Sequence, residues 1–295
     1  MKKLFLVFLI SFTLFNSGCD NGFDIVSGYE EQLVVFLVLD NRYDKQIINV
    51  QKLQNSRGVT TLEKLVDPVS VRIVHPLGYS ITFKDTVINT VSNYNTLYID
   101  SLDLTEGVYQ LFVNARDSLY AWSNITVGPA LRVSISRTDT TFSVYLNATR
   151  SVRGASIKPY LPYTLRQNSE FIEKSIELPR ALYINKNDTV EVFSRCVQID
   201  GTTSSHSELP YSSVLYMRDK LINYFGAENV QFHNRVKFVA YGYDWSLYEY
   251  INLQEGYSDD FSVRLDKPNY TNIVGGMGIF GAVLVDSAIA TIYIN

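Results

Sequence analysis

The sequence has 295 residues, a formal net charge of −4 at pH 7 and an isoelectric point near 5.5. This acidic balance lacks the basic field that attracts nucleic acid, so no nucleic-acid partner is expected. With 21 Tyr and 16 Phe but only 3 Met, the composition favours β-strands.

Residues 1–18 have the layout of a secretory signal. Two lysines precede an apolar run over residues 4–15, which is too short to cross a bilayer. Small residues then precede Cys19, and this order resembles the lipobox of bacterial lipoproteins, although Asn16 stands where Leu is commonest. We expect cleavage before Cys19 and anchoring to a membrane by acyl chains, such as palmitate, on that thiol. The alternative is an ordinary secretory signal with a chance cysteine. If Cys19 is lipidated, Cys196 has no partner for an internal disulfide.

Asp20 follows Cys19 in a segment, residues 19–29, that we expect to form a lipidated tether. In enterobacteria, an Asp at this place tends to retain a lipoprotein in the inner membrane. In Bacteroidota, acidic residues just after the cysteine instead favour export to the surface. These residues alone do not choose between the two sorting rules.

The next segment, residues 30–128, shows strand patterns only. A continuous apolar run covers Leu33–Leu39, and a turn-like segment covers residues 40–44. In the stretch 107–113 a glycine, a tyrosine two residues later and alternating apolar residues are typical of immunoglobulin-like sandwiches. In such sandwiches the tyrosine, here Tyr109, packs at a corner and bonds back to the backbone. We therefore expect an immunoglobulin-like β-sandwich.

The pair Gly128-Pro129 predicts a boundary, followed by a second β-rich unit over residues 129–295. An apolar repeat with helical period predicts a helix near residues 212–225, capped by Ser212 or Ser213 and ended by a glycine. A second short helix is expected over 244–251. The predicted fold is thus mostly β, with an N-terminal sandwich and a second β-rich unit that carries one or two short α-helices.

Two packed β units would form a concave surface at their interface, where pockets are frequent. Tyr241, Tyr243 and Trp245 alternate and would line that surface if they lie on one strand. The alternative is that these aromatic residues form one apolar face of the core. A continuous sheet and core across residue 129 would contradict both the two units and the pocket between them.

The segment Gly276–Gly281 matches the dinucleotide fingerprint G-x-G-x-x-G. The context does not fit, because that fingerprint opens a helix in a βαβ unit and the following residues indicate a strand. We therefore expect a glycine-rich turn or bulge, with at least one of Gly276, Gly278 and Gly281 at positive φ or in close strand contact. No nucleotide cofactor is predicted.

Three histidines, His75, His206 and His233, are scattered without the close spacing of a metal motif. No serine lies in a nucleophile elbow, and no phosphate-binding loop is present. The sequence therefore predicts no catalytic residue, no cofactor and no metal.

Six Asp-Ser or Asp-Thr pairs resemble the O-glycosylation sites of exported Bacteroidota proteins. Such pairs also mark turns that enter strands, because both side chains bond to their own backbone, and the sequence leaves both interpretations open. The candidate acceptors are Thr86, Ser101, Ser118, Thr140, Thr189 and Ser287.

The C-terminal stretch Tyr270–Gly281 resembles the closing motif of a Bacteroidota lipoprotein family, the domain of unknown function 4249. The lipoprotein signal, the GVYQLFV strand and the triplet at residues 248–250 resemble the same family. The resemblance implies a lipoprotein of the outer membrane, on its periplasmic face or at the cell surface, often encoded near TonB-dependent receptors. It favours the Bacteroidota sorting rule and implies no reaction and no site residues.

From these features we expect a non-catalytic binding or accessory protein at the outer membrane, serving uptake or envelope assembly. Its partners would be the membrane, through Cys19, and a TonB-dependent receptor or other envelope protein. Two alternatives remain: a structural or adhesive surface protein, and a glycan-acting enzyme with two carboxylates that the sequence does not pair.

Overall fold

The computed structural model describes residues 31–56, 59–66, 68–85, 94–115, 119–147, 151–179, 182–185, 188–191, 197–198, 205–255 and 270–292. Over these ranges the chain is mostly β, as the sequence predicted. Within them, none of the helices has the length and hydropathy needed to span a bilayer. Cys19 and the predicted signal lie outside the described residues.

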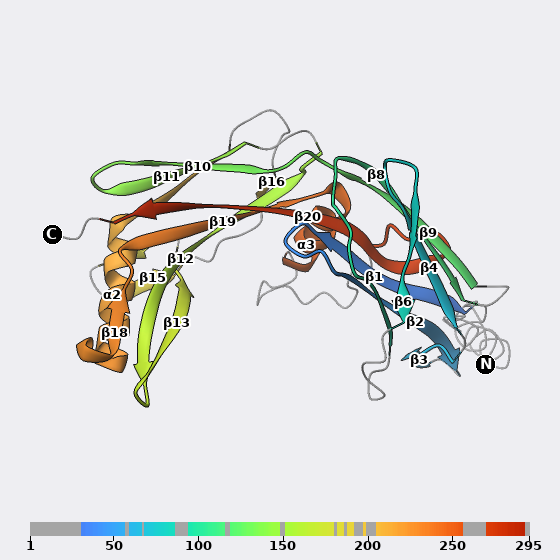
Figure 1. Ribbon diagram of the computed structural model, residues 1–295, viewed down its shortest axis with the longest axis horizontal. Coiled ribbons are helices and arrows are strands. Elements are labelled where there is room, and N and C mark those ends of the chain that lie inside the picture. Colours follow the sequence, from blue (N-terminus) through green and yellow to red (C-terminus); the bar gives the residue numbers. More distant parts are fainter. Residues whose placement is uncertain are drawn as a thin grey trace, which may run out of the picture.

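One large sheet extends through the whole arch of the molecule (Figure 1). Its main strands, in spatial order, are β13 (Glu170–Glu177), β12 (Gly154–Gln167), β19 (Arg235–Tyr243), β20 (Gly276–Thr291), β1 (Gln32–Asp40), β2 (Gln46–Ser56), β7 (Asn95–Ile99) and β6 (Lys84–Asp85). Three shorter strands pair beside this path: β3 (Val59–Glu63), β16 (Val197–Gln198) and β18 (Val230–Phe232). We call this assembly the long sheet.

Two smaller sheets lie on the upper side of the long sheet in Figure 1. The first contains β5 (Ser80–Thr82), β4 (Val69–Val74), β8 (Gly107–Ala115) and β9 (Leu119–Val127). The second contains β10 (Arg132–Arg137), β11 (Thr141–Asn147) and β17 (Ser205–Pro210). A separate hairpin pairs β14 (Leu182–Asn185) with β15 (Asp188–Glu191). The helical elements are α2 (Tyr211–Phe225), the 3-10 turn η1 (Ala227–Asn229) and α3 (Trp245–Glu255).

Strand β20 joins the two ends of the arch because it changes partner along its length. Its first half pairs in parallel with β1, from Leu33 opposite Gly276 to Asp40 opposite Val283. Its second half pairs antiparallel with β19, from Val283 to Thr291. Strands from before and after residue 129 therefore share one sheet, and their buried side chains form one connected core. The prediction of two β units with separate sheets, and of a pocket between them, is wrong.

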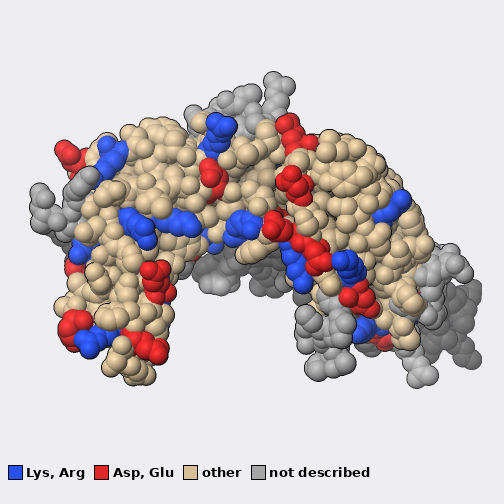
Figure 2. Space-filling view, in the orientation of Figure 1, with Lys and Arg blue, Asp and Glu red and all other residues tan. Residues whose placement is uncertain are grey.

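The long sheet buries one face and exposes the other, as strand alternation requires. In β1, Leu33, Val35 and Leu37 are buried, whereas Phe36 and Val38 point outward and are exposed. The buried face packs against the two smaller sheets, and the outward face follows the underside of the arch. Figure 2 shows that the molecule is hollowed between its two legs on this side.

The sandwich at the β8 end contains the predicted tyrosine corner. Tyr109 is fully buried. Its hydroxyl accepts a hydrogen bond from the Thr105 amide at 2.8 Å and donates to the Thr105 carbonyl at 3.1 Å. These bonds close the loop that leads into β8, so this prediction from the local sequence is confirmed.

Helix α2 follows the predicted apolar repeat, with Val214, Met217 and Leu221 buried. Its predicted cap is wrong, because the helix begins one residue after Pro210 without a side-chain cap and Ser213 is buried inside its first turn. The second predicted helix is present as α3. Trp245 therefore opens a helix and does not continue the strand of Tyr241.

The glycine-rich motif forms the start of β20 and pairs with β1 in unbroken register, so the prediction of a turn or bulge between strands is wrong. Gly278 has φ +110°, so the prediction of a positive φ is confirmed. A Cβ at Gly278 would lie 2.0 Å from the carbonyl oxygen of Val35, and one at Gly276 would lie 2.6 Å from that of Leu33. Glycine is thus needed here because β1 runs unusually close to β20.

Candidate functional site

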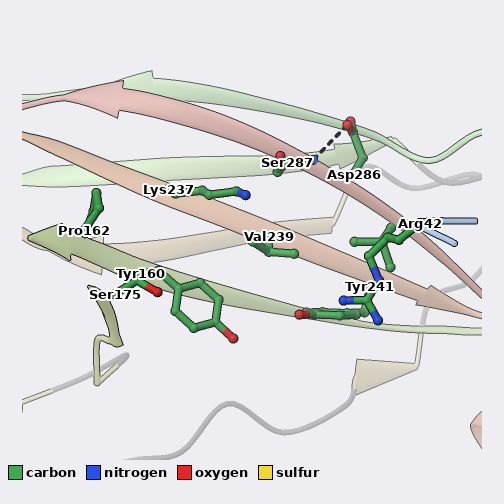
Figure 3. Close-up of a pocket in the computed structure, with 10 residues that line it drawn as sticks. Arg42, Tyr160, Pro162, Ser175, Lys237, Val239, Tyr241, Asp286 and Ser287 are labelled. Atoms are coloured by element: carbon green, nitrogen blue, oxygen red, sulfur yellow. Dashed lines mark hydrogen bonds between the residues drawn. The ribbon is translucent and has the colours of Figure 1, made fainter. Parts of the chain in front are cut away.

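The outward face of the long sheet carries a groove of about 450 Å³, which we call the tyrosine groove (Figure 3). It draws residues from β12, β13, β19, β20 and the turn after β1. Its lining residues are Arg42, Tyr160, Pro162, Ser175, Lys237, Val239, Tyr241, Val285, Asp286 and Ser287. The groove has the size usual for small-ligand sites.

Strand register determines which side chains enter the groove. Tyr160 lies directly opposite Lys237, and Tyr241 lies directly opposite Val285. Residues two positions apart on β19 share a face, so Val239 lies between Lys237 and Tyr241 on this surface. The intervening residues of β19 are buried on the other side.

Two cations lie within 6 Å of the centre of the Tyr241 ring. The Arg42 guanidinium carbon is 5.4 Å from the Tyr241 ring centroid, and the Lys158 ammonium nitrogen is 5.9 Å from it. Arg42 is in turn held by Asp40, whose two carboxylate oxygens accept from the Arg42 Nε at 3.0 and 3.1 Å. That hydrogen bonding raises the pKa of Arg42, although partial burial opposes it. The arginine therefore stays charged beside the tyrosine.

Tyr160 places its hydroxyl toward that of Tyr241 (Figure 3). The pKa of Tyr160 is raised to about 12, mainly by burial; the nearby Tyr241 hydroxyl and Glu177 carboxylate act in the same direction, and Arg42 opposes them. The phenol consequently keeps its proton at neutral pH. It can therefore donate a hydrogen bond to a ligand in the groove.

Lys237 is the groove's exposed lysine, and its side chain extends along β19 in Figure 3. Its cross-strand neighbours are Tyr160 and Ile289, neither of which carries a negative charge at neutral pH. Within the described part of the chain, Lys237 has no ion-pair partner, whereas the Lys158 nitrogen lies 3.8 Å from a Glu177 oxygen.

Asp286 is the carboxylate that lines the groove, but backbone amides occupy both of its oxygens. Oδ2 accepts from the Val133 amide at 2.9 Å, and Oδ1 accepts from the Ser287 amide at 2.8 Å. Figure 3 shows the carboxylate turned away from Tyr160 and Tyr241. Its negative charge is therefore stabilised on the β10 side of the strand.

A second hollow of about 710 Å³, the turn groove, shares Arg42 with the tyrosine groove. Its lining residues are Val38, Asp40, Arg42, Tyr43, Asp44, Lys45, Gln46, Ile47 and Asp100. The exposed apolar residues Val38 and Ile47 lie in it. Because the two hollows share Arg42, they form one continuous surface along the outward face. Figure 2 shows Lys and Arg side chains in a row over the central strands.

The candidate glycosylation residues are not brought together. Thr86 and Ser118 lie outside the described residues. Ser101 follows β7, Thr140 lies in the exposed turn between β10 and β11, and Thr189 is in β15. Ser287 lies in the tyrosine groove.

The histidines also remain apart, and no cluster of three or more potential metal ligands occurs among the described residues. The Nε2 atom of His75 lies 3.1 Å from the Asp103 carbonyl, in the loop before β8. The Nε2 atom of His233 lies 2.8 Å from the Thr164 hydroxyl, beside β12. Position 206 is in β17, and its side chain is not described.

Of the three aromatic residues proposed to line a pocket between two units, Tyr241 instead lines the tyrosine groove on the face of the one long sheet. The Tyr243 hydroxyl lies 2.9 Å from the Ser156 hydroxyl, and Trp245 lines a different hollow beside α3. Sequence reasoning missed Arg42, Tyr160 and Lys237. The alternation of apolar and polar residues over 157–165 was a usable signal for β12, but two prolines inside it argue against a central strand.

Comparison with known proteins adds no family. No family model matches the chain, and no curated protein matches its sequence. Solved structures with partial similarity include native α-2-macroglobulin of Escherichia coli, at 12% identity and TM-score 0.25, covering 74% of this chain and 13% of that one. A DUF4785 family protein of Legionella pneumophila has 13% identity and TM-score 0.24, with coverages of 70% and 51%. The C-terminal globular domain of the Pyrococcus abyssi oligosaccharyltransferase has 12% identity and TM-score 0.27, with coverages of 73% and 49%. The chain thus spans about half or less of the length of these proteins.

Proposed function

We propose that this chain is a lipoprotein of the bacterial outer membrane that binds another envelope component without catalysing a reaction on it. The acyl chains on Cys19 would hold it at the membrane, on the periplasmic face or at the cell surface. Its role would be uptake or envelope assembly, beside a TonB-dependent receptor. The signal sequence and the resemblance of residues 270–281 to an outer-membrane lipoprotein family support this proposal.

The observation that carries the binding role is the continuous outward face of the long sheet. The tyrosine groove and the turn groove meet at Arg42 and present tyrosines, cations and exposed apolar side chains together. Tyrosines give large contact areas at a low cost in conformational entropy, which suits them to recognition. A broad face of this kind favours contact with a partner over a buried reaction site.

The anchor is tested by labelling cells with an alkyne fatty acid. The wild type and Cys196→Ala should take up the label and sediment with outer membranes, because Cys19 is intact in both. Cys19→Ala should lose the label and either leave the membrane or accumulate as precursor. Equal labelling of Cys19→Ala and the wild type would contradict the proposal.

The binding role is tested by co-purification with TonB-dependent receptors of the same membrane. Reversing the charge with Lys237→Glu should reduce recovery of a receptor, because Lys237 lies on the outward face. Lys174→Glu is the control, because Lys174 is exposed on the neighbouring strand β13 but points to its other face. Equal recovery with both variants would count against this face as the contact surface.

A further inference from the structure

The tyrosine groove combines several hydroxyl groups with one cation, Lys237, that has no carboxylate partner among the described residues. We propose that it binds a sugar that carries a carboxylate or a phosphate, with Lys237 holding the anionic group and tyrosine and serine hydroxyls holding the sugar. This inference deepens the proposed function by giving its binding face a ligand class. The proposal of an outer-membrane role and the proposal of a ligand for the groove can be contradicted independently of each other.

The charge argument starts from which cations are already neutralised. Arg42 is paired with Asp40, and Lys158 lies near Glu177. Lys237 has no carboxylate partner in the described part of the chain, although it lines the groove. A ligand anion would supply the missing partner, and a charge-assisted hydrogen bond of this kind is stronger than a neutral one.

The carboxylate that lines the groove, Asp286, does not repel such a ligand strongly. Both oxygens of Asp286 accept from backbone amides, and its side chain turns away from the two tyrosines. Arg42 and Lys158 flank Tyr241 within 6 Å of its ring. Because Arg42 and Lys158 already have carboxylate neighbours, Lys237 is the cation of the groove that attracts the negative charge of a ligand.

The hydroxyl groups indicate the rest of the ligand. Tyr160, Tyr241, Ser175 and Ser287 all line the groove, and each hydroxyl can both donate and accept a hydrogen bond. A sugar presents the same dual groups along its ring, so it can match several of them at once. Pro162 and Val239 add apolar surface against which a sugar ring can pack.

The test is isothermal titration calorimetry on the lipidated full-length protein in detergent at low ionic strength. The probes are glucuronate, glucose 6-phosphate and glucose, which share a sugar ring but differ in the anionic group. We expect at least one of the two anionic sugars to bind about tenfold or more tighter than glucose, with affinity falling as salt is added. Tight binding of glucuronate alone identifies a carboxylate ligand, and tight binding of glucose 6-phosphate alone identifies a phosphate ligand.

Substitutions of Lys237 test whether the sugar binds in the tyrosine groove. Lys237→Gln should weaken the anionic sugar about tenfold or more, and Lys237→Arg should retain most of the affinity. Lys174→Gln removes the same charge from an exposed strand residue on the other face, so it should bind like the wild type. Circular dichroism checks that the variants fold.

Two results would overturn the inference: equal affinity for the anionic sugars and glucose, or the same loss of affinity in Lys174→Gln and Lys237→Gln. Either result would leave fatty-acid labelling of Cys19 and receptor recovery unaffected. Conversely, loss of the outer-membrane assignment would leave the calorimetric result in place.

Discussion

The side-chain amide of Asn41 completes the hydrogen bonding of Val285, a residue 244 positions away. The Asn41 Oδ1 accepts from the Val285 amide at 2.7 Å, and its Nδ2 donates to the Val285 carbonyl at 3.1 Å. Asn272 does the same for Phe280 on the other edge of β20, at 2.9 and 2.7 Å. Strand β20 changes partner from β1 to β19, so some backbone groups along its edges are reached by neither strand. The side chains of Asn41 and Asn272 form hydrogen bonds to those groups.

Replacing Asn41 should therefore weaken the join between the two halves of the long sheet. Asn41→Ala removes both hydrogen bonds to Val285, and because the site is exposed, water replaces them in part. We expect the free energy of unfolding to fall by about 1–2 kcal/mol. Urea denaturation of the detergent-solubilised protein measures this loss. Asn114→Ala is the control, because Asn114 is exposed on β8; it should change the free energy of unfolding by less than about 0.5 kcal/mol. An equal loss in both variants would contradict the role of Asn41.

Local patterns predicted the elements whose partners are close in the chain. The apolar run at Leu33–Leu39 and the helical repeat before Phe225 correspond to β1 and α2. Tyr109 was found because a sandwich corner has a local sequence signature. The pairing of β1 with β20 was missed, because residue periodicity shows which face is buried but not which distant strand lies alongside.

The candidate site was harder to predict for the same reason. Tyr241 was noticed through its alternation with other aromatic residues, but its neighbours come from four separate segments of the chain. Arg42 is in a segment that was predicted only to be turn-like. Tyr160 lies between two prolines, which argue against a strand. Only the register of β12, β19 and β20 places Tyr160 beside Lys237.

The close approach of β20 to β1 makes a second prediction. In Gly278→Ala the new Cβ would lie 2.0 Å from the Val35 carbonyl oxygen, at a backbone φ of +110°. The strands must separate, so we expect a loss of several kcal/mol or failure to fold. Gly78→Ala is the matched control, because Gly78 also has positive φ but has open space around its Cβ position.

That control should cost only about 1–2 kcal/mol, the penalty for left-handed backbone alone. Thermal unfolding followed by circular dichroism separates the two outcomes. Similar melting temperatures for both variants would show that the close contact with Val35 does not determine the loss of stability. Saturable binding of NAD or ATP by the wild type would contradict the structural interpretation of these glycines.

A third prediction concerns the tyrosine corner. Tyr109→Phe keeps the buried ring but removes the hydroxyl that bonds to both backbone groups of Thr105. Because the Thr105 amide loses its partner, we expect a destabilisation of about 1–3 kcal/mol. Tyr120→Phe, on the exposed face of β9, should be close to neutral in the same urea titration. A neutral Tyr109→Phe would show that packing alone holds this corner.

The last prediction is a pH dependence that arises from Asp244, a buried carboxyl group between β19 and α3. Its Oδ1 accepts from the amides of Ala282 and Leu247 at 2.9 and 3.1 Å, and its Oδ2 accepts from Ser246 at 3.3 Å. Burial raises the pKa of Asp244 from 3.8 to about 6, although these amides oppose the shift. The folded protein consequently binds more protons at this group than the unfolded chain between pH 4 and 6.

By linkage, this group stabilises the fold below about pH 4, and that contribution is lost as the pH rises through about 6. The loss amounts to at most about 3 kcal/mol at 1.36 kcal/mol per pKa unit. Asp244→Asn cannot titrate, so its free energy of unfolding should improve relative to the wild type as the pH is raised from 4 to 7. Urea titrations of both proteins at several pH values measure this difference. The quantity to follow is the free energy of unfolding of Asp244→Asn minus that of the wild type. If this difference stays constant or falls with rising pH, the pKa of Asp244 is not raised in the folded protein.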